Sequence, residues 1–421
     1  MGGLLRLLQV ALAAGLVVIL TRNLSLAEYG LWASLGVIGS LVMVTSGVGA
    51  RLCNELAAGG GNKDEEERRR LFLAVFSVCA RGCWAAGGLF LLLSPLVPWR
   101  AILGQADPAL FHLARRGFLA ALLLQATGMP FVLGSYGMRA YRKNVAVAML
   151  SPLAVAVSLG LVVLFLSGRS RLPLLLAPFA AWNLVFFAGF VLFLRSRGWR
   201  WRFVPLAEAW PLFRLLLADS LMFSLLAFAL GFLLQSLTFL TSRRLGYDAA
   251  GGLDVYVKIY LAVLAGLSEV LHPLWPEYLR RLAAGDWRGI RRQLRSSLAV
   301  AAALSIAAAI GGTVAAPLLV RMLAGRAIAL PKSTLALLGA WLLCGALIQA
   351  LQMFLNACNA TRAQLLAAVL LLLALPLASD RFTAAWGRNG ALVAVVLCLG
   401  MLLLVMAWRS GRELERLRLR D

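Results

Sequence analysis

The chain alternates long apolar runs with short polar segments in which arginine predominates. Each run is about as long as the roughly 20 apolar residues that a helix needs to cross a bilayer. The runs are continuously apolar rather than alternating between two faces, which favours helices over the strands of a membrane barrel. Eight runs contain no Asp, Glu, Lys or Arg: those between residues 28 and 51, 116 and 139, 143 and 169, 171 and 195, 219 and 243, 295 and 321, 332 and 362, and 388 and 409. Four weaker candidates, at 4–20, 71–93, 253–274 and 363–378, bring the predicted number of spans to twelve.

The composition agrees with this pattern, because 62% of the residues are hydrophobic and only 14% are charged. Soluble domains are far less apolar than this. The first apolar segment, with Arg6 before it, has the layout of a signal peptide. A counterpart at 221–240 in the second half of the chain argues that the segment is retained. We therefore predict an all-α polytopic membrane protein.

The distribution of lysine and arginine predicts the orientation in the membrane. If alternate loops are assigned to one face, beginning with the N-terminus, that face holds 24 basic residues and the other holds 13. Positively charged loops stay inside, so both termini are expected to be cytoplasmic. A net charge of +23 would suggest nucleic acid as the partner of a soluble chain. Here the charge is scattered over short loops, which favours anionic membrane lipids as partners and excludes nucleic acid.

The two halves of the chain resemble each other at an offset of 221 or 222 residues. The segment RNLSLAEYGLWASLGVI, which starts at Arg22, corresponds to RRLGYDAAGGLDVYVKI, which starts at Arg243. Likewise SPLVPWRAILG, from Ser94, corresponds to APLLVRMLAG, from Ala316. We predict two six-helix lobes, 1–205 and 206–421, related as a parallel internal repeat. Transporters are often built from such repeats and work by alternating access.

Three segments resemble polysaccharide flippases of the multidrug/oligosaccharidyl-lipid/polysaccharide (MOP) exporter superfamily. In ILTRNLSLAEYGLWASL, Arg22, Leu24, Glu28, Tyr29 and Gly30 match the first hairpin of that family. The segments SGVGARLCNELA and LHPLWPEYLRRLAAGD are similar to the ends of its second and eighth spans.

The resemblance implies a MATE-like fold of twelve helices in two lobes, located in a bacterial inner membrane. It also implies a flippase that moves a polyprenyl-diphosphate-linked oligosaccharide from the cytoplasmic to the outer leaflet. Such a substrate requires an electropositive, water-filled cavity rather than catalytic residues, so neither an enzyme nor a cofactor is expected. We expect the protein to be monomeric.

Arg81 is the first candidate for contact with the substrate. It lies at the middle of the third predicted span, where an arginine costs about 2.5 to 3.5 kcal/mol. It is interpreted either as a cavity residue that binds phosphate or as a residue that snorkels or pairs with a neighbouring carboxylate. The repeat has Ala302 at the equivalent position, so the fold itself does not require this arginine.

Two pairs of opposite charge have helical spacing. Lys258 follows Asp254 by four residues in the eighth predicted span, and Glu55 follows Arg51 by four residues near the end of the second. Each pair is interpreted either as part of the substrate path or as a local ion pair. Arg51 aligns with His272, and both residues are expected to flank a cytoplasmic entrance that an incoming diphosphate contacts first.

Asp219 and Glu269 are carboxylates within the seventh and eighth predicted spans. Such residues relay protons or bind sodium in many transporters. One interpretation is therefore coupling of transport to a proton or sodium gradient. The other is that these acids balance Arg81 or Lys258.

Other classes of protein fit the sequence less well. A drug or cation antiporter of the same superfamily is the nearest alternative, but the first six predicted spans hold Glu55 as their only acid, near an end. A membrane glycosyltransferase or ligase would also act on polyprenyl-linked glycans, but it would need more acids or histidines than these loops offer. The chain has no Gly-rich phosphate loop of an ATPase. Cys79 and Cys83 have helical spacing but no nearby ligand partners, so no metal site is predicted.

Overall fold

The protein is described here from a computed structural model, which covers residues 2–58, 64–104, 108–168, 170–271, 274–325, 328–358 and 360–419. Within these ranges, the side chains of residues 2, 3, 6, 58, 218, 219, 269 and 276 are outside the description. The structure is 91% helical, and the covered residues contain no strand. The predicted all-α polytopic membrane fold is confirmed.

The chain forms two compact units. Unit 1 consists of Met1–Leu24 and Leu35–Gly231, and unit 2 consists of Ser25–Ser34 and Phe232–Asp421. Two helices contribute residues to both units, α2 (Leu26–Gly39) and α10 (Leu206–Leu271). The short segment Ser25–Ser34, the central part of the first copy of the repeated turn, therefore belongs to the same unit as the second copy.

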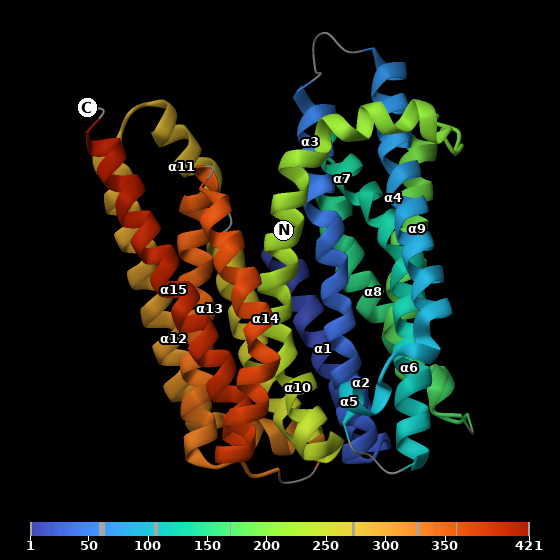
Figure 1. The fold of residues 1–421 in the computed structure, drawn as a ribbon, viewed down its shortest axis with the longest axis vertical. Helices are drawn as coiled ribbons and strands as arrows, with labels where there is room; N and C mark the ends of the chain where they lie inside the picture. The colour runs from blue at the N-terminus through green and yellow to red at the C-terminus, as the bar shows by residue number, and fades with distance from the viewer. Residues whose placement is uncertain are drawn as a thin grey trace. The chain divides into compact units, whose positions relative to one another are not determined.

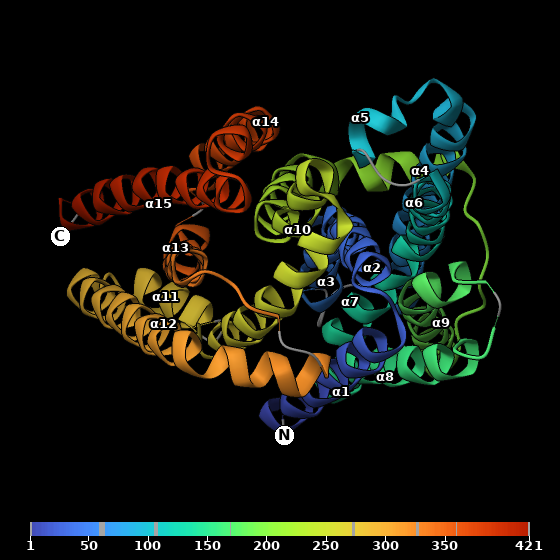
Figure 2. The same cartoon turned by 90° about the horizontal axis from the view of Figure 1, so that it is seen from below.

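Unit 1 is a bundle in which α8 contacts α1 and α9, and α6 contacts α4 and α9 (Figure 2). Its elements, besides the parts of α2 and α10, are α1 (Gly2–Asn23), η1 (Ser40–Thr45), α3 (Ser46–Ala58), α4 (Glu65–Leu93), η2 (Ser94–Leu96), α5 (Trp99–Leu103), α6 (Pro108–Gly128), η3 (Met129–Val132), α7 (Leu133–Ala140), α8 (Asn144–Phe165) and α9 (Leu172–Ser196). The core is aromatic where α4 meets α9, because the rings of Phe72 and Phe76 stack on Phe190.

The segment 198–205, which precedes α10, packs onto this aromatic core. Trp199 is buried against Phe72 and Phe193, and Trp201 has its ring against Phe76. Tryptophan alternates with arginine in this segment, and the indole rings pack on the aromatic core of unit 1. Burial of such large rings stabilises the bundle.

Unit 2 is built around α13, which contacts α11, α12 and α15 (Figure 2). Its helices, besides the parts of α2 and α10, are α11 (Leu274–Ala283), α12 (Trp287–Ala324), α13 (Lys332–Ala357), α14 (Thr361–Trp386) and α15 (Arg388–Arg418). Both α11 and the C-terminal end of α15 lie at one end of this unit (Figure 1), which we call the α11 end. Side chains of α13 such as Trp341 and Phe354 are fully buried.

Ten helices among the covered residues are long and apolar enough to cross a membrane. The predicted count of twelve is not confirmed. The predicted spans 219–243 and 253–274 lie on either side of Gly246, whose φ of 83° and ψ of 169° interrupt α10. The weak first span falls in α1, whose apolar part, Leu7–Asn23, is shorter than a full span. Two predicted spans, 28–51 and 116–139, are interrupted by the short turns η1 and η3, the latter at Pro130.

Candidate functional site

A buried carboxylate in unit 2 collects three polar partners. Lys258 Nζ lies 2.7 Å from Asp254 Oδ2. The Tyr29 hydroxyl donates a hydrogen bond of 2.8 Å to the same oxygen, and the Thr238 hydroxyl donates one of 3.1 Å to Oδ1. Asp254 is only 3% exposed. A buried charge is stable only when it is paired and hydrogen-bonded, and both oxygens of this carboxylate are satisfied.

The same cluster connects the first hairpin to α10. Lys258 Nζ lies 4.8 Å above the centre of the Trp32 ring, which in turn lies 5.5 Å from the ring of Tyr29. A cation over a tryptophan face is attracted by the negative face of the ring. We call Tyr29, Trp32, Thr238, Asp254 and Lys258 the Asp254 cluster.

The backbones of the two repeated turns also meet directly. A Cβ atom added at Gly30 would collide with the carbonyl oxygen of Tyr247, and one added at Gly251 would collide with that of Leu26. Glycine is therefore required at both positions, because no other residue permits so close an approach of two backbones. The sequence showed the two turns as copies but not that they touch each other.

Arg81 lies half-buried on α4 and contacts the segment before α10. Its Nη1 donates a hydrogen bond of 2.8 Å to the carbonyl oxygen of Val204, and its guanidinium lies 5.5 Å from the centre of the Phe203 ring. The backbone N–H of Val204 donates a hydrogen bond of 3.0 Å to the hydroxyl of Ser77, one turn earlier on α4. The structure therefore provides a backbone carbonyl as a partner for this arginine.

Arg51 and Glu55 form the predicted ion pair on α3, with 3.3 Å between Nη2 and Oε1. They line a groove of about 460 Å³ in unit 1, which we call the α3/α4 groove. Its other charged residues are Glu67 and Arg70, and Arg70 lies 3.9 Å from Glu208. Two arginines thus face two glutamates, so the charges within the groove are balanced.

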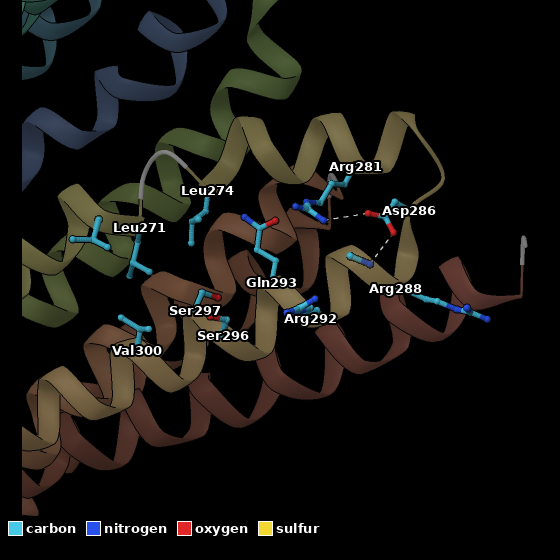
Figure 3. A pocket seen from close by; sticks show the side chains of 12 residues that line it. Leu271, Leu274, Arg281, Asp286, Arg288, Arg292, Gln293, Ser296, Ser297 and Val300 are labelled. Carbon is cyan, nitrogen blue, oxygen red and sulfur yellow. Dashed lines mark hydrogen bonds and ion pairs between the residues drawn. The ribbon is translucent and has the colours of Figure 1, made fainter.

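A larger cavity, the α11/α12 pocket, lies at the α11 end of unit 2 (Figure 3). It measures about 670 Å³, which is within the usual range for a ligand site. Three arginines and one aspartate line it, namely Arg281, Arg288, Arg292 and Asp286. The rest of the lining is polar at Gln293, Ser296 and Ser297 and apolar at Val270, Leu271, Leu274 and Val300.

Asp286 is fully engaged by its own surroundings. As the N-cap of α12 it accepts a hydrogen bond of 2.8 Å from the N–H of Gly289, and its other oxygen lies 3.1 Å from Arg281 Nη1. Arg281 also donates to Glu277 at 2.9 Å. The charge of Arg281 is therefore compensated, whereas Arg288 and Arg292 have no acidic partner among the residues that the structure covers.

Behind the pocket, Tyr278 of α11 and Ser297 of α12 share a hydrogen bond of 3.3 Å. The single hydroxyl proton of Ser297 is donated to the carbonyl oxygen of Leu294, so Tyr278 is the donor. Burial raises the pKa of the Tyr278 phenol, which keeps it protonated for this role. The contact joins α11 to α12 and fixes the back of the pocket.

The remaining predicted site residues cannot be compared with the structure. His272 lies outside the described residues, as do the side chains of Asp219 and Glu269. The structure brings Asp254 together with Lys258 and Arg51 together with Glu55, but Arg81 contacts none of these four. All six cysteines are free, and no group of three or more metal-ligating side chains occurs within the described ranges.

One charged site was not anticipated from the sequence. Asp380 on α14 accepts a hydrogen bond of 2.8 Å from Arg244 Nε and lies 3.1 Å from Arg243 Nη2. Both arginines belong to the second copy of the repeated turn. Their position before Gly246 was visible in the sequence, but a partner more than 130 residues later was not.

Comparison with known proteins identifies the fold. No sequence-family model matches the chain, and no curated protein matches it by sequence. Solved structures do: a multidrug resistance MATE family transporter of the MOP superfamily has a TM-score of 0.73 at 12% identity, over 97% of this chain and 95% of that one. The lipid II flippase MurJ has a TM-score of 0.64 at 12% identity, over 99% and 90%. A MOP superfamily transporter from Pyrococcus furiosus has a TM-score of 0.59 at 12% identity, over 97% and 96%. The chain has the MATE-like fold that the sequence resemblance implied.

Proposed function

We propose that the protein is a flippase that moves a polyprenyl-diphosphate-linked oligosaccharide from the cytoplasmic to the outer leaflet by alternating access. The fold supports a transporter, because the similar structures are MATE transporters and a lipid II flippase. In the proposed orientation both termini and the α11 end of unit 2 face the cytoplasm, in agreement with the basic loops.

We propose an anionic rather than a cationic cargo because the buried carboxylates are paired with basic residues. Among the described residues, the buried acids are Asp254 and Glu413. Asp254 lies 2.7 Å from Lys258, and Glu413 lies 2.8 Å from Arg409. A cation site needs a carboxylate whose charge is available, and these two are already neutralised. The arginines of the α11/α12 pocket instead offer positive charge to an anion.

The binding-site charge can differ within one fold. The transporter from Pyrococcus furiosus is described as having a binding pocket of reversed polarity that suggests a different function. Fold similarity to multidrug transporters is therefore compatible with a different cargo. The proposal of an anionic cargo is based on the charged residues of this chain.

Reconstitution in liposomes tests the proposed function directly. A fluorescent polyprenyl-diphosphate oligosaccharide is placed in both leaflets, and a membrane-impermeant quencher is added outside. With protein we expect the protected fraction to become accessible, and with empty liposomes we expect it to stay protected. A parallel experiment follows a cationic dye. Transport of the dye without flipping of the lipid would establish the drug/cation antiporter and refute the flippase.

The same liposomes test the proposed coupling to an ion gradient. We expect flipping to depend on an imposed proton or sodium gradient if Asp219 or Glu269 binds the coupling ion. Asp219→Asn and Glu269→Gln should then flip lipid at a rate that the gradient no longer changes. An unaltered gradient dependence in both variants would leave these acids only the role of balancing charge.

A further inference from the structure

We propose that the α11/α12 pocket binds the phosphate-bearing head group of a membrane lipid in the cytoplasmic leaflet. The inference concerns binding, so it does not require that the bound lipid be transported. It rests on two arginines without acidic partners, on a shielded amide oxygen and on an apolar wall. Arg292 lies near Gln293 within the pocket, whereas Arg288 lies at its edge and its side chain extends outward, away from Arg292 (Figure 3).

The positive charge of the pocket is available to a ligand. Arg281 is compensated by Glu277 and Asp286, but Arg288 and Arg292 have no ion pair with any residue in the described part of the chain. They stand four residues apart, on neighbouring turns of α12, and the guanidinium of Arg288 lies 5.7 Å from the centre of the Trp287 ring. Guanidinium groups recognise phosphate through paired hydrogen bonds, so Arg292 in the pocket and Arg288 at its edge are each suited to a phosphate group.

The next residues on this face are polar. Gln293 projects from α12 toward α11, between Leu274 and Arg281 (Figure 3). Its side-chain oxygen is buried and accepts no hydrogen bond. A buried acceptor without a donor is costly, so a ligand that supplies a hydroxyl group would be stabilised here. Head groups with glycerol or sugar hydroxyls have that chemistry.

Beyond the polar residues the pocket becomes apolar and open. Val270 and Val300 are 55% and 41% exposed although both line the cavity. Exposed apolar side chains continue along α12 at Leu304, Ile310 and Val314. From Gly289 to Val300 the helix rises about 16 Å, so charge, polarity and apolarity follow one another over the length of a lipid head group and its first methylenes.

The succession of charged, polar and apolar residues along α12 favours a lipid over a soluble anion as the ligand. A free phosphate would use the arginines but leave the apolar wall exposed, whereas a lipid covers both. Basic pockets between helices on the cytoplasmic side are known to bind anionic head groups. A phospholipid and a polyprenyl diphosphate share this chemistry, and a binding experiment distinguishes them.

The test measures binding of four probes to the purified full chain in detergent by native mass spectrometry. The probes are phosphatidylglycerol, phosphatidylcholine, polyprenyl diphosphate and inorganic pyrophosphate. We expect phosphatidylglycerol or polyprenyl diphosphate to bind and phosphatidylcholine and pyrophosphate to bind far more weakly. Tighter binding of polyprenyl diphosphate would identify a substrate entry site, and tighter binding of phosphatidylglycerol a site for a structural lipid. Equal affinity for pyrophosphate would overturn the proposal.

Two matched pairs of substitutions locate the site. Arg288→Gln/Arg292→Gln removes the pocket arginines, and Arg291→Gln/Arg295→Gln removes two exposed arginines of the same helix that do not line the pocket. We expect the first pair to weaken lipid binding about 30-fold and the second to change it less than about threefold. An equal loss in both pairs would show general attraction to basic charge and refute a built site. Unchanged melting temperatures confirm that both variants are folded.

Gln293→Leu tests the role of the shielded oxygen. Wild-type protein should prefer phosphatidylglycerol over phosphatidylmethanol, which carries the same charge but no head-group hydroxyl, by about fivefold. The variant should bind both equally. If wild-type protein shows no such preference, the amide does not contact the head group and the proposed placement of the lipid is wrong.

Discussion

The α3/α4 groove of unit 1 and the α11/α12 pocket of unit 2 occupy corresponding places in the two repeats. Each lies at the start of a long helix whose N-cap is an aspartate, Asp64 for α4 and Asp286 for α12. The first turn of α4 then carries three glutamates, whereas the first turn of α12 carries no acid and contains Arg288. The duplication preserved the cap and the cavity while the charges diverged.

This difference is informative because acids, not arginines, suit the start of a helix. A negative side chain in the first turn contributes about 0.3 to 1 kcal/mol through the helix dipole, and a positive one opposes it. The stability of α12 therefore does not explain Arg288. In the groove, Arg51 and Arg70 pair with Glu55 and Glu208. Of these two cavities, it is the pocket whose described residues include arginines without an acidic partner.

The third spans of the repeats also differ, because the first has Arg81 where the second has Ala302. The substitution Arg81→Ala removes this difference and should have the largest effect. We expect normal expression and transport below detection, because the change removes both a charge within a span and the hydrogen bond to Val204. Lipid flipping per folded molecule is the measurement. Phe203→Leu, which removes the aromatic ring but keeps Arg81 and its hydrogen bond to Val204, is the control and should retain most activity. Full activity of Arg81→Ala would refute a role for this residue.

Reversing the charge of the pocket, so that acids outnumber arginines there, should have the next largest effect. In Arg288→Glu/Arg292→Glu the pocket would repel a phosphate, and we expect about 100-fold slower flipping, which corresponds to about 2.7 kcal/mol. Arg291→Glu/Arg295→Glu changes the net charge equally and should remain within about threefold of wild type. If both variants lose activity to the same extent, the loss follows the net charge of α12, and the pocket arginines have no special role.

The Asp254 cluster provides another comparison, because the first repeat has Ala33 and Val37 where the second has Asp254 and Lys258. Asp254→Asn leaves Lys258 without its carboxylate and should lower the free energy of unfolding by about 2 kcal/mol. Asp254→Ala/Lys258→Val copies the first repeat and should recover at least half of that loss. Denaturation in detergent measures both. If the loss in this double variant equals the sum of the losses in Asp254→Ala and in Lys258→Val, the two charges are not coupled.

Charge reversal at Arg51 should have the smallest effect. The substitution Arg51→Glu should weaken substrate binding only about threefold, because a half-exposed arginine that already pairs with Glu55 contributes little. The substrate concentration for half-maximal flipping is the measurement. Arg51→Glu/Glu55→Arg restores the pair in reverse order and should return the value toward wild type. An increase of 100-fold would make the groove as important as the pocket.

Most of the fold could be predicted from the sequence, but its interruptions could not. Runs such as 332–362 and 388–409 correspond to α13 and α15, because a helix in a bilayer must be long and apolar. The breaks at η1 and η3 within predicted spans were missed, since the apolar pattern continues through them. Hydropathy shows that a segment is apolar but not whether its α-helix is interrupted.

The candidate sites were predictable only where both partners lie on one helix. Arg51 with Glu55 and Asp254 with Lys258 follow from a spacing of four residues, and both pairs are present. In the sequence, the pocket arginines contribute to the count of basic residues on one face of the membrane. Their grouping around a cavity depends on how α11 packs against α12. No spacing in the sequence encodes that packing.

The sequence alone determined the helical membrane class, the internal repeat, the balance of basic charge and the local ion pairs, because these depend on composition and on neighbours along the chain. Only the tertiary structure decided that Tyr29 binds Asp254 and that Arg81 binds Val204, contacts that span 225 and 123 residues. It also decided that Ser25–Ser34 of the first hairpin belongs to unit 2. The physical reason is that lipid-facing and protein-facing helix surfaces are equally apolar, so the pattern of hydrophobic residues does not specify which helices meet.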